Sequence, residues 1–445
     1  MITKEKHIFY FIGIGGVGMS ALARLCFRQG HRVFGYDKTP SEITQQLIDQ
    51  GIAIEYDEAV SALSSEIMSP EVIVIYTAAI PENHPQLSYF KKLGNLVMKR
   101  AKFLAELCSD KKTLAVAGTH GKTTTSLILT HIFSETKQSF TSVMGGFFNN
   151  DSSNLIQKGE DKFIVEADEY DRSFLHLHPN IACITSLEAD HLDIYKTETA
   201  FKEAFERFSE QVKQVLIVAY GIPLSGLTYG IDVEADYKAF NLIMTARGYQ
   251  FDLRTPSGIY YNANFNQMGV HNVSNALGAI AMADQAGINM KQALLAFESF
   301  PGVSRRMNVY HWKNTVLIDD YAHHPTEIES VFETIKSFYP KQKNCVIFQP
   351  HLFSRTQDFM KEFSLVLSKF DEVVLMDIYP AREAPISGIN ASSLLDLISH
   401  DQKICIHKTE IKNVLETTEA SVVALLGAGD IGAEIQQLKS LFTER

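Results

Sequence analysis

A single stretch, Thr113–Ser126 with the sequence T-L-A-V-A-G-T-H-G-K-T-T-T-S, limits the folds open to this chain more than any other. The apolar run Leu114–Ala117 is typical of a short buried strand, Gly118–Gly121 predict a sharp turn, and a helix is expected to begin at Lys122. Strand, turn and helix in this order direct backbone N–H groups and the positive end of a helix dipole at one point. We therefore expect a polyphosphate there, with the Lys122 ammonium on its terminal phosphates and the Thr123 hydroxyl on Mg²⁺.

The spacing of this motif is shorter than that of the usual phosphate loop. In the usual pattern, G-x-x-x-x-G-K-[ST], the first glycine falls at a position that Val116 occupies here. An ordinary strand-to-helix turn that happens to contain Gly-Lys-Thr is the alternative. Nucleotide binding is the better interpretation, because strand, turn and helix all occur where the motif requires them.

Composition places the chain among globular proteins of several domains. Its 445 residues suit about two to four domains. Hydrophobic residues make up 45% and charged residues 21%, as in folded globular proteins. The balance of 41 basic against 52 acidic side chains gives a net charge of −11, so neither nucleic acid nor an anionic membrane is an expected partner.

The cysteines and apolar runs indicate a reducing compartment. The five cysteines are scattered without C-x-x-C spacing, so we expect neither a disulfide framework nor a zinc knuckle. The apolar run Ile8–Ile14 meets glycines too soon for a membrane-spanning helix, and no cleavage site follows it. A cytoplasmic location without membrane insertion is therefore expected.

A second glycine loop lies near the start of the chain. An apolar strand over His7–Ile14 runs into G-I-G-G-V-G with glycines at Gly13, Gly15 and Gly18, and Asp37 follows a second strand. This arrangement is typical of a dinucleotide-binding loop with an acidic residue on a ribose hydroxyl. The glycines admit any pyrophosphate to the helix N-terminus, so a UDP-sugar and a nicotinamide or flavin dinucleotide both remain open.

Polar residues after other strands are candidates for the same sites. The strand Val72–Tyr76 ends in a loop that contains Ala78, and loops at strand carboxyl ends line ligand sites in such sheets. Arg100 precedes a helix and could meet a phosphate, or it could be a solvated surface charge. Glu166 follows the strand Phe163–Val165 and is well placed for Mg²⁺.

Histidines and amides in two further loops are candidate ligands. His191 lies in the acidic loop after the strand Ile181–Thr185, where a metal or phosphate role is favoured over a structural one. His271, Asn272 and Asn275 open an Ala-rich helix, where they could be helix caps or could contact a base edge.

Beyond the linker Phe300–Val303 the alternation of strands and helices starts again. Four expected strands each end in polar residues: Thr315–Ile318, Cys345–Phe348, Val373–Met376 and Val422–Leu426. Their shared carboxyl ends predict one active-site edge in a third α/β domain.

Motifs along nearly the whole chain resemble those of the Mur ligase family of peptidoglycan synthesis. They are G-I-G-G-V-G-M-S-A-L-A at Gly13, A-G-T-H-G-K-T-T-T at Ala117, E-A-D-E-Y-D-R-S-F at Glu166, L-E-A-D-H-L-D at Leu187, H-N-V-S-N-A-L at His271, D-D-Y-A-H-H-P-T-E-I at Asp319 and Q-P-H-L-F-S-R-T at Gln349. Their order makes them far more specific together than either glycine loop alone.

The resemblance implies an α/β fold of three domains. These are an N-terminal Rossmann-like domain for a UDP-sugar (residues 1–110), a central P-loop ATPase-like domain with a mixed sheet flanked by helices (111–300), and a C-terminal Rossmann-like domain for the amino acid and closure over ATP (301–445). It also implies an ATP- and Mg²⁺-dependent ligase that joins L-alanine to the lactyl carboxylate of UDP-N-acetylmuramate through an acyl phosphate. The partners are then small molecules, and the protein is a monomer or weak homodimer.

The resemblance assigns roles to individual residues. For ATP they are Gly118, Thr119, His120, Gly121, Lys122, Thr123, Thr124, His271, Asn272, Asn275, Arg306 and Asp319; for the UDP-sugar, Gly13, Gly15, Gly16, Val17, Gly18, Asp37, Ala78 and Arg100; for the amino acid, Tyr321, His351 and Arg355; for the metal, Thr123, Glu166 and His191. Lys122, Arg355 and His324 are the expected catalytic residues, with His324 in proton transfer or amine orientation unless it only caps a helix.

Two positions depart from the family pattern, and two alternative functions stay open. Family members often carry Arg where this chain has Leu352 and Asn where it has Ser186, so Leu352 removes one cation from the amino-acid pocket.

A sister ligase that recycles murein tripeptide onto the same nucleotide sugar is the alternative within the family. An NAD-dependent oxidoreductase is the alternative of another class.

Overall fold

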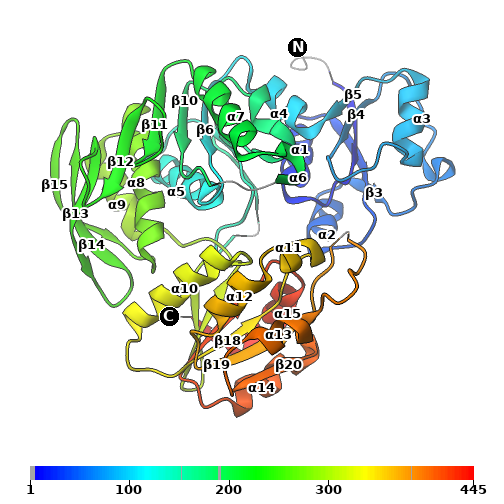
Figure 1. The fold of residues 1–445 in the computed structure, drawn as a ribbon. Coiled ribbons are helices and arrows are strands. Elements are labelled where there is room, and N and C mark those ends of the chain that lie inside the picture. Colours follow the sequence, from blue (N-terminus) through cyan, green and yellow to red (C-terminus); the bar gives the residue numbers. More distant parts are fainter. Residues whose placement is uncertain (1–5, 152, 189–191, 382, 445) are drawn as a thin grey trace. The chain divides into compact units, whose positions relative to one another are not determined.

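The chain forms a mixed α/β fold built on separate sheets, as the sequence predicts. The structure is a computed structural model and describes residues 6–151, 153–188, 192–381 and 383–444. In these ranges the strands form an N-terminal, a central and a C-terminal sheet, each with connecting helices (Figure 1). No helix of the described ranges is both long and apolar enough to cross a bilayer.

The N-terminal sheet is parallel and has the strand order β3-β2-β1-β4-β5. Its elements are β1 (Ile8–Ile12), α1 (Val17–Arg28), β2 (Arg32–Tyr36), α2 (Glu42–Asp49), β3 (Ala53–Glu55), β4 (Ile73–Tyr76), α3 (Pro85–Leu93), β5 (Val97–Lys99) and α4 (Arg100–Cys108). The central strand β1 pairs with β2 on one side and with β4 on the other, so the chain continues first to one side of β1 and later to the other. The glycine loop therefore leaves β1 at the point where the strand order reverses, the usual position of a ligand crevice.

The central sheet has the strand order β15-β14-β13-β12-β11-β10-β6-β9-β7-β8. Its elements are β6 (Lys112–Ala117), α5 (Lys122–Glu135), β7 (Thr141–Val143), β8 (Leu155–Gln157), β9 (Lys162–Glu166), β10 (Ile181–Ile184), α6 (Leu192–Tyr195), α7 (Glu198–Glu210), β11 (Val215–Ala219), β12 (Leu227–Ile231), β13 (Tyr237–Met244), β14 (Tyr249–Thr255), β15 (Gly258–Phe265), α8 (Val270–Gln285) and α9 (Met290–Glu298). Strand β6 lies between the parallel strands β9 and β10. The loops after these strands therefore meet at one edge.

The C-terminal sheet has the strand order β20-β19-β18-β21-β17-β16-β22. Its elements are β16 (Asn308–Trp312), β17 (Thr315–Asp320), α10 (Pro325–Phe338), β18 (Asn344–Phe348), α11 (Phe353–Asp358), α12 (Met360–Leu367), β19 (Glu372–Met376), α13 (Ala391–Leu397), β20 (Lys403–Ile406), α14 (Ile411–Thr417), β21 (Val422–Leu426), α15 (Ile431–Leu438) and β22 (Thr443–Glu444). Strands β18 and β21 are buried throughout, which suits a parallel sheet covered by helices on both faces. Apolar residues of α10, α12 and α13 cover one face, and those of α14 and α15 cover the other.

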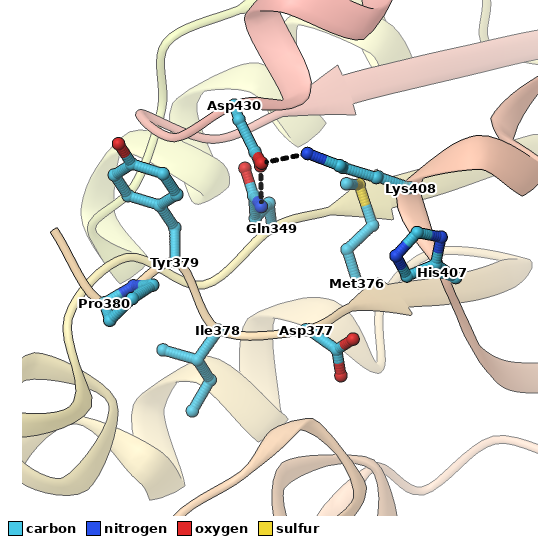
Figure 2. A pocket seen from close by; sticks show the side chains of 9 residues that line it. All are labelled: Gln349, Met376, Asp377, Ile378, Tyr379, Pro380, His407, Lys408 and Asp430. Carbon is cyan, nitrogen blue, oxygen red and sulfur yellow. Dashed lines mark hydrogen bonds and ion pairs between the residues drawn. The ribbon is translucent and has the colours of Figure 1, made fainter. Parts of the chain in front are cut away.

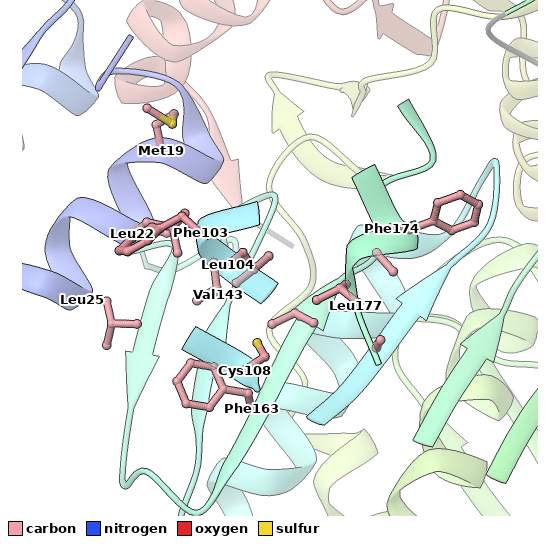
Figure 3. Packing of buried hydrophobic residues seen from close by; sticks show 14 of the residues in the cluster. Met19, Leu22, Leu25, Phe103, Leu104, Cys108, Val143, Phe163, Phe174 and Leu177 are labelled. Carbon is pink, nitrogen blue, oxygen red and sulfur yellow. The ribbon is translucent and has the colours of Figure 1, made fainter. Parts of the chain in front are cut away.

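One hydrophobic core joins the N-terminal and central sheets. Helix α1 contributes Met19, Leu22 and Leu25, and these belong to the same cluster as Val143 of β7 and Phe163 of β9 (Figure 3). Burial of each such side chain contributes roughly 1.5–3 kcal/mol. The helix that begins at the first glycine loop is therefore packed on the sheet that carries the second.

Contacts within the chain divide it into two compact units. The first contains Met1–Ile243, Gln250–Phe265 and Ser274–Phe300, and the second contains Met244–Tyr249, Asn266–Val273 and Pro301–Arg445. The N-terminal and central sheets thus belong to the first unit and the C-terminal sheet to the second. The domain boundaries at residues 110 and 300 stay a prediction.

Candidate active site: two phosphate loops and a C-terminal pocket

The loop after β6 has the backbone that a phosphate loop requires. Gly118 and Gly121 both lie in the left-handed region, with φ of 130° and 86°, which side chains rarely adopt. A Cβ on Gly118 would lie 2.8 Å from the backbone nitrogen of Ser186, and one on Gly121 would overlap the amide oxygen of Asn275. Both positions therefore require glycine, and Asn275 is brought directly to this loop.

Residues after β10 hold the phosphate loop in place. The Ser186 hydroxyl accepts the backbone N–H of His120 at 2.7 Å, and the Thr119 hydroxyl donates to the carbonyl of Glu188 at 2.7 Å. Ser186 is one of the two departures from the family pattern, and here it supports the loop directly. Thr124 is buried on α5, whereas His191 lies outside the described residues.

The Lys122 ammonium is held within the loop by a buried carboxylate. It donates to both carboxylate oxygens of Glu169, at 2.7 and 2.9 Å, and to the carbonyls of Gly118 and Thr119. The Glu169 side chain is 1% exposed and that of Lys122 is 17% exposed. Burial raises the pKa of Glu169, although the Lys122 charge opposes this. Glu169 belongs to the motif that begins at Glu166, but sequence reasoning missed this pair because nothing local links Lys122 to Glu169.

The carboxylate of Glu166 lies next to the hydroxyl expected to bind metal. Its oxygens accept hydrogen bonds from the Thr123 hydroxyl at 3.0 Å, the Ser126 hydroxyl at 3.2 Å and the backbone N–H of Gly145 at 2.7 Å. In the described ranges no group of three or more His, Cys, Asp or Glu side chains is placed to hold a metal ion. The Thr123 and Glu166 oxygens fit Mg²⁺, which in nucleotide sites takes one or two carboxylates and completes its shell with phosphates and water.

The first glycine loop is hydrogen-bonded to the end of β2. Gly13 has φ of 84°, and its N–H donates to the Tyr36 carbonyl at 2.7 Å. The N–H of Gly15 donates to the Asp37 carboxylate at 2.7 Å. Asp37 is thus brought to the loop, where it holds the loop backbone. Gly16 and Val17 lie at the start of α1, and Ala78 lies in the loop after β4.

Arg100 faces the first glycine loop and the central domain together. A Cβ on Gly18 would lie 2.7 Å from a guanidinium nitrogen of Arg100, so the side chain reaches the N-terminus of α1. Its guanidinium also lies 3.4 Å from the Asp168 carboxylate and is 25% exposed. Of the two interpretations of Arg100, a position beside the phosphate loop fits this geometry, and a fully solvated surface charge does not.

In the second unit, a buried ion pair lies beside an aromatic ring. The Arg305 guanidinium donates to the Asp319 carboxylate, which is 1% exposed, at 3.1 Å. The ring of Tyr321 lies 5.6 Å from the Arg305 guanidinium and 5.3 Å from that of Arg306. Asp319 is therefore engaged by Arg305, a residue that sequence reasoning did not single out.

Two of the residues expected to cap a helix or contact a base edge lie at the start of α8, in the second unit. His271 and Asn272 fall inside the first turn of this helix, and the Asn272 amide donates to the carbonyl of Met268 at 2.7 Å. Asn272 is buried and satisfied within the chain. Its predicted contact with a base edge is not tested by this geometry.

His324 is the N-cap of α10. Its Nδ1 accepts the backbone N–H of Thr326, and Glu327 completes a capping box. Its ring packs edge-on against Phe359 with centroids 4.6 Å apart. His324 is thus a helix cap in this structure, and its part in proton transfer or amine orientation stays a prediction.

His351 lies in a cluster of aromatic rings. It stacks on Tyr379 with centroids 5.7 Å apart, and the His323 ring meets it edge-on at 5.9 Å. Its Nδ1 is buried and has no hydrogen-bond partner among the described residues. Burial lowers the pKa of His351 to about 4, and the neighbouring His323 and Arg355 act in the same direction. The imidazole is therefore neutral at neutral pH.

The helix that carries Arg355 begins with a strained residue. Leu352 is the N-cap of α11 with φ of 72°, a conformation uncommon for a residue with a branched side chain. Its N–H donates to the Tyr379 carbonyl at 2.9 Å. The residue that departs from the family pattern is thus fixed by the same Tyr379 that stacks on His351.

A pocket of about 160 Å³ opens at the carboxyl ends of β18, β19, β20 and β21 (Figure 2). Within it the Asp430 carboxylate accepts from the Gln349 amide at 2.5 Å and from the Lys408 ammonium at 2.8 Å. Sequence reasoning predicted polar residues at this edge but did not name these three as a group. Strands far apart in the sequence bring them together.

Each of the two glycine loops connects a parallel strand to a helix. The second loop also carries Lys122 and lies beside the Thr123 hydroxyl and the Glu166 carboxylate. These features define a nucleotide-binding α/β protein. Three family models match the chain: "Mur ligase family, catalytic domain" over residues 8–112, "Mur ligase middle domain" over 116–283, and "Mur ligase, glutamate ligase domain" over 305–432. The chain is also 46% identical to the UDP-N-acetylmuramate–L-alanine ligase of Flavobacterium psychrophilum, over 100% of both chains. The chain belongs to the Mur ligase family, as the motifs predict.

Solved structures with the same fold include ligases of this family. The UDP-N-acetylmuramate–alanine ligase of Thermotoga maritima is 27% identical, with a TM-score of 0.84 over 98% of this chain and 99% of that one. A murein peptide ligase from Psychrobacter arcticus has a TM-score of 0.69 over 98% of both chains at 23% identity, and this likeness concerns the fold alone. The predicted three-domain α/β architecture is confirmed.

Proposed function

We propose that this chain is an ATP-dependent ligase that joins the amine of L-alanine to the lactyl carboxylate of UDP-N-acetylmuramate in peptidoglycan precursor synthesis. The observation that carries the proposal is the 46% identity, over the full length of both chains, to a ligase named for this reaction. The two glycine loops support it independently, since the reaction uses two substrates that each carry a pyrophosphate or polyphosphate group.

The chemistry explains the need for ATP. A carboxylate does not acylate an amine at neutral pH, because its oxygen is a poor leaving group. Transfer of the γ-phosphoryl group of ATP to the lactyl carboxylate releases ADP and forms an acyl phosphate. The neutral amine then attacks the acyl carbon, and phosphate leaves as the amide forms. The protein supplies position and charge neutralisation for these steps.

For ATP, we propose that the loop Gly118–Gly121 surrounds the phosphates and that Lys122 neutralises their charge. Thr123 and Glu166, with His191, would hold Mg²⁺, which neutralises phosphate charge when bound. The hydrogen bond between the Thr123 hydroxyl and the Glu166 carboxylate supports this assignment. Thr124, His271, Asn272, Asn275, Arg306 and Asp319 complete the proposed ATP residues.

For the nucleotide sugar, we propose that the pyrophosphate lies at the N-terminus of α1, on the loop from Gly13 to Gly18. Arg100 would neutralise part of its charge, and its approach to Gly18 supports this. Asp37 and Ala78 would line the same crevice, as loops at strand carboxyl ends do in such sheets.

For the amino acid, we propose a site formed by Tyr321, His351 and Arg355. An arginine guanidinium binds a carboxylate through two parallel hydrogen bonds, which suits the carboxylate of L-alanine. A neutral imidazole at His351 can accept a hydrogen bond from the amine. His324, the N-cap of α10, is proposed for proton transfer or amine orientation beside this site.

We further propose that the protein is a monomer or weak homodimer. We propose a cytoplasmic location, since the nucleotide substrates are cytoplasmic metabolites.

Two alternative functions are separable in one experiment. Purified protein is incubated with ATP, Mg²⁺, NAD, UDP-N-acetylmuramate and equal concentrations of L-alanine and L-Ala-γ-D-Glu-meso-diaminopimelate. The ligase products are weighed by mass spectrometry, and reduction of NAD is followed by absorbance. The proposal expects the alanyl product and ADP; the tripeptide product would establish the sister ligase, and turnover of NAD without ADP would establish an oxidoreductase.

A further inference from the structure

Asn154, which lies just before β8 and is fully buried, connects the first glycine loop to the segment after β7. Its amide nitrogen donates to the carbonyl of Val17, in the first glycine loop, and to the hydroxyl of Ser20 at 2.9 Å. Its backbone carbonyl accepts the N–H of Met144 at 3.0 Å. One residue of the central domain is thus bonded both to the loop proposed for the nucleotide sugar and to the segment that follows β7.

The segment after β7 orients the carboxylate proposed for the metal. Gly145 follows Met144, and its N–H donates to Glu166 at 2.7 Å. A Cβ on Gly145 would lie 2.5 Å from a Glu166 carboxylate oxygen, so the backbone lies directly against that group. Three hydrogen bonds, joined by the covalent chain within Asn154 and between Met144 and Gly145, therefore lead from Val17 to Glu166.

Arg24 fixes the orientation of the Asn154 amide. The buried Arg24 guanidinium, which can only donate, binds the Asn154 side-chain oxygen, the Gln46 oxygen at 2.8 Å and the Gln50 oxygen at 3.3 Å. The amide oxygen must therefore face Arg24, and the amide N–H groups must face Val17 and Ser20. The shared hydrophobic core of α1, β7 and β9 keeps both ends of this connection in one body (Figure 3).

We propose that Asn154 is a positioning residue that couples the two phosphate loops. Pyrophosphate binding at the first loop fixes the Val17 carbonyl, and through Asn154 this fixes the Gly145 N–H that orients Glu166 for the metal–nucleotide complex. The affinities of the two ligands then depend on each other, and the dependence is reciprocal. This inference rests on the proposed function, because it takes a UDP-sugar and Mg²⁺–ATP as the two ligands.

The test is calorimetric titration of UDP-N-acetylmuramate in the absence and presence of saturating Mg²⁺–AMPPNP, without L-alanine. The wild-type protein should show a ratio of dissociation constants of about 5-fold or more, the range typical of allosteric coupling. Asn154→Asp keeps the oxygen that binds Arg24 but places an oxygen against the Val17 carbonyl. It should bring the ratio to within about 2-fold of one.

Asn95→Asp is the matched control. The Asn95 amide also donates to two carbonyls, those of Ser69 and Val72, at 2.8 Å each. It lies at the amino ends of β4 and β5, away from both loops, so its variant should keep the wild-type ratio. A merely structural Asn154 would weaken both ligands in Asn154→Asp while leaving the ratio unchanged, and that result would overturn the proposal.

Three further outcomes are informative. If Asn154→Asp does not fold, Ser20→Ala removes one hydrogen bond of the Asn154 amide and should still lower the ratio; an unchanged ratio in that variant would overturn the proposal. A wild-type ratio of one would also overturn it. Failure of wild-type protein to bind UDP-N-acetylmuramate at all would instead contradict the proposed function, so the two failures are distinguishable.

Discussion

The Lys122 ammonium lies 2.7 Å from the nearer carboxylate oxygen of Glu169, a side chain that is 1% exposed. Lys122 is the residue proposed to neutralise the phosphates of ATP, so its charge has a buried partner within the protein. An ATP phosphate would compete with Glu169 for the same ammonium or would join it. The strength of nucleotide binding therefore depends on the balance between these two anions.

Replacement of Lys122 by alanine should lower the rate of ADP release about 10²–10³-fold, as loss of one charge-stabilising group typically does. ADP release that requires all three substrates is the quantity to measure, with a coupled assay. Lys202→Ala, which removes an exposed lysine paired with Glu198 on α7, is the control and should keep the wild-type rate. Normal turnover by Lys122→Ala would remove the ATP assignment of this loop.

Glu169→Gln should destabilise the fold, because it removes the negative charge paired with the Lys122 ammonium and replaces one of the two acceptor oxygens by an NH₂ donor. We expect a loss of about 2 kcal/mol in the free energy of unfolding, below the roughly 3–5 kcal/mol typical of fully buried pairs. Urea denaturation measures it, and bound Mg²⁺–AMPPNP should recover part of the loss by placing negative charge at Lys122. The exposed Glu198→Gln should be nearly neutral. Equal stability of Glu169→Gln and wild type would show that the pair contributes nothing.

Gly145→Ala should weaken the binding of Mg²⁺–ATP specifically. The new methyl group would lie 2.5 Å from a Glu166 oxygen, so the carboxylate must move away from Thr123. A Mg²⁺ titration of activity should show a requirement about 10-fold higher, which corresponds to roughly 1.4 kcal/mol. Gly94→Ala, at a left-handed position with φ of 84° and open space around it, should reduce stability without changing the Mg²⁺ requirement. An identical Mg²⁺ requirement in Gly145→Ala would argue against Glu166 as a ligand.

Arg355→Ala should raise the KM for L-alanine about 10–100-fold, with a smaller change in kcat, because it removes a charge-assisted contact to the carboxylate. Arg355→Lys keeps the charge but loses the paired geometry, so an intermediate KM is expected. Steady-state kinetics with L-alanine as the varied substrate measure both. If KM is unchanged and kcat alone falls, Arg355 acts on the reacting groups and does not bind the carboxylate of L-alanine.

His351 should make stability depend on pH between about 4 and 6.5. Burial first, and then His323 and Arg355, lower the pKa of His351 to about 4, against about 6.5 in an unfolded chain. Between these values the unfolded state binds more protons, so this contribution is complete above about pH 6.5 and is lost as the pH falls towards 4. The difference in unfolding free energy between wild type and His351→Gln, measured across this range, should shrink at low pH. A constant difference would contradict the lowered pKa.

Local patterns determined the phosphate loops of this protein. A buried strand, glycines that must adopt positive φ and a helix that begins at Lys122 are neighbours in the chain, so their geometry follows from local sterics and hydrogen bonding. The same holds for the alternation of strands and helices, which predicted an α/β fold. Membership of the Mur ligase family also followed from local motifs, which are specific because so many occur in the expected order.

Only the tertiary structure decided which side chains meet between these segments. The pairing of Lys122 with Glu169, the contact of Asn154 with Val17 and the stacking of His351 on Tyr379 join residues that no local pattern relates. The structure also places His324 at the N-cap of α10, a position that the sequence left open. The physical reason is that such contacts depend on strand order and helix packing, which bring distant parts of the chain together only once the whole core is formed.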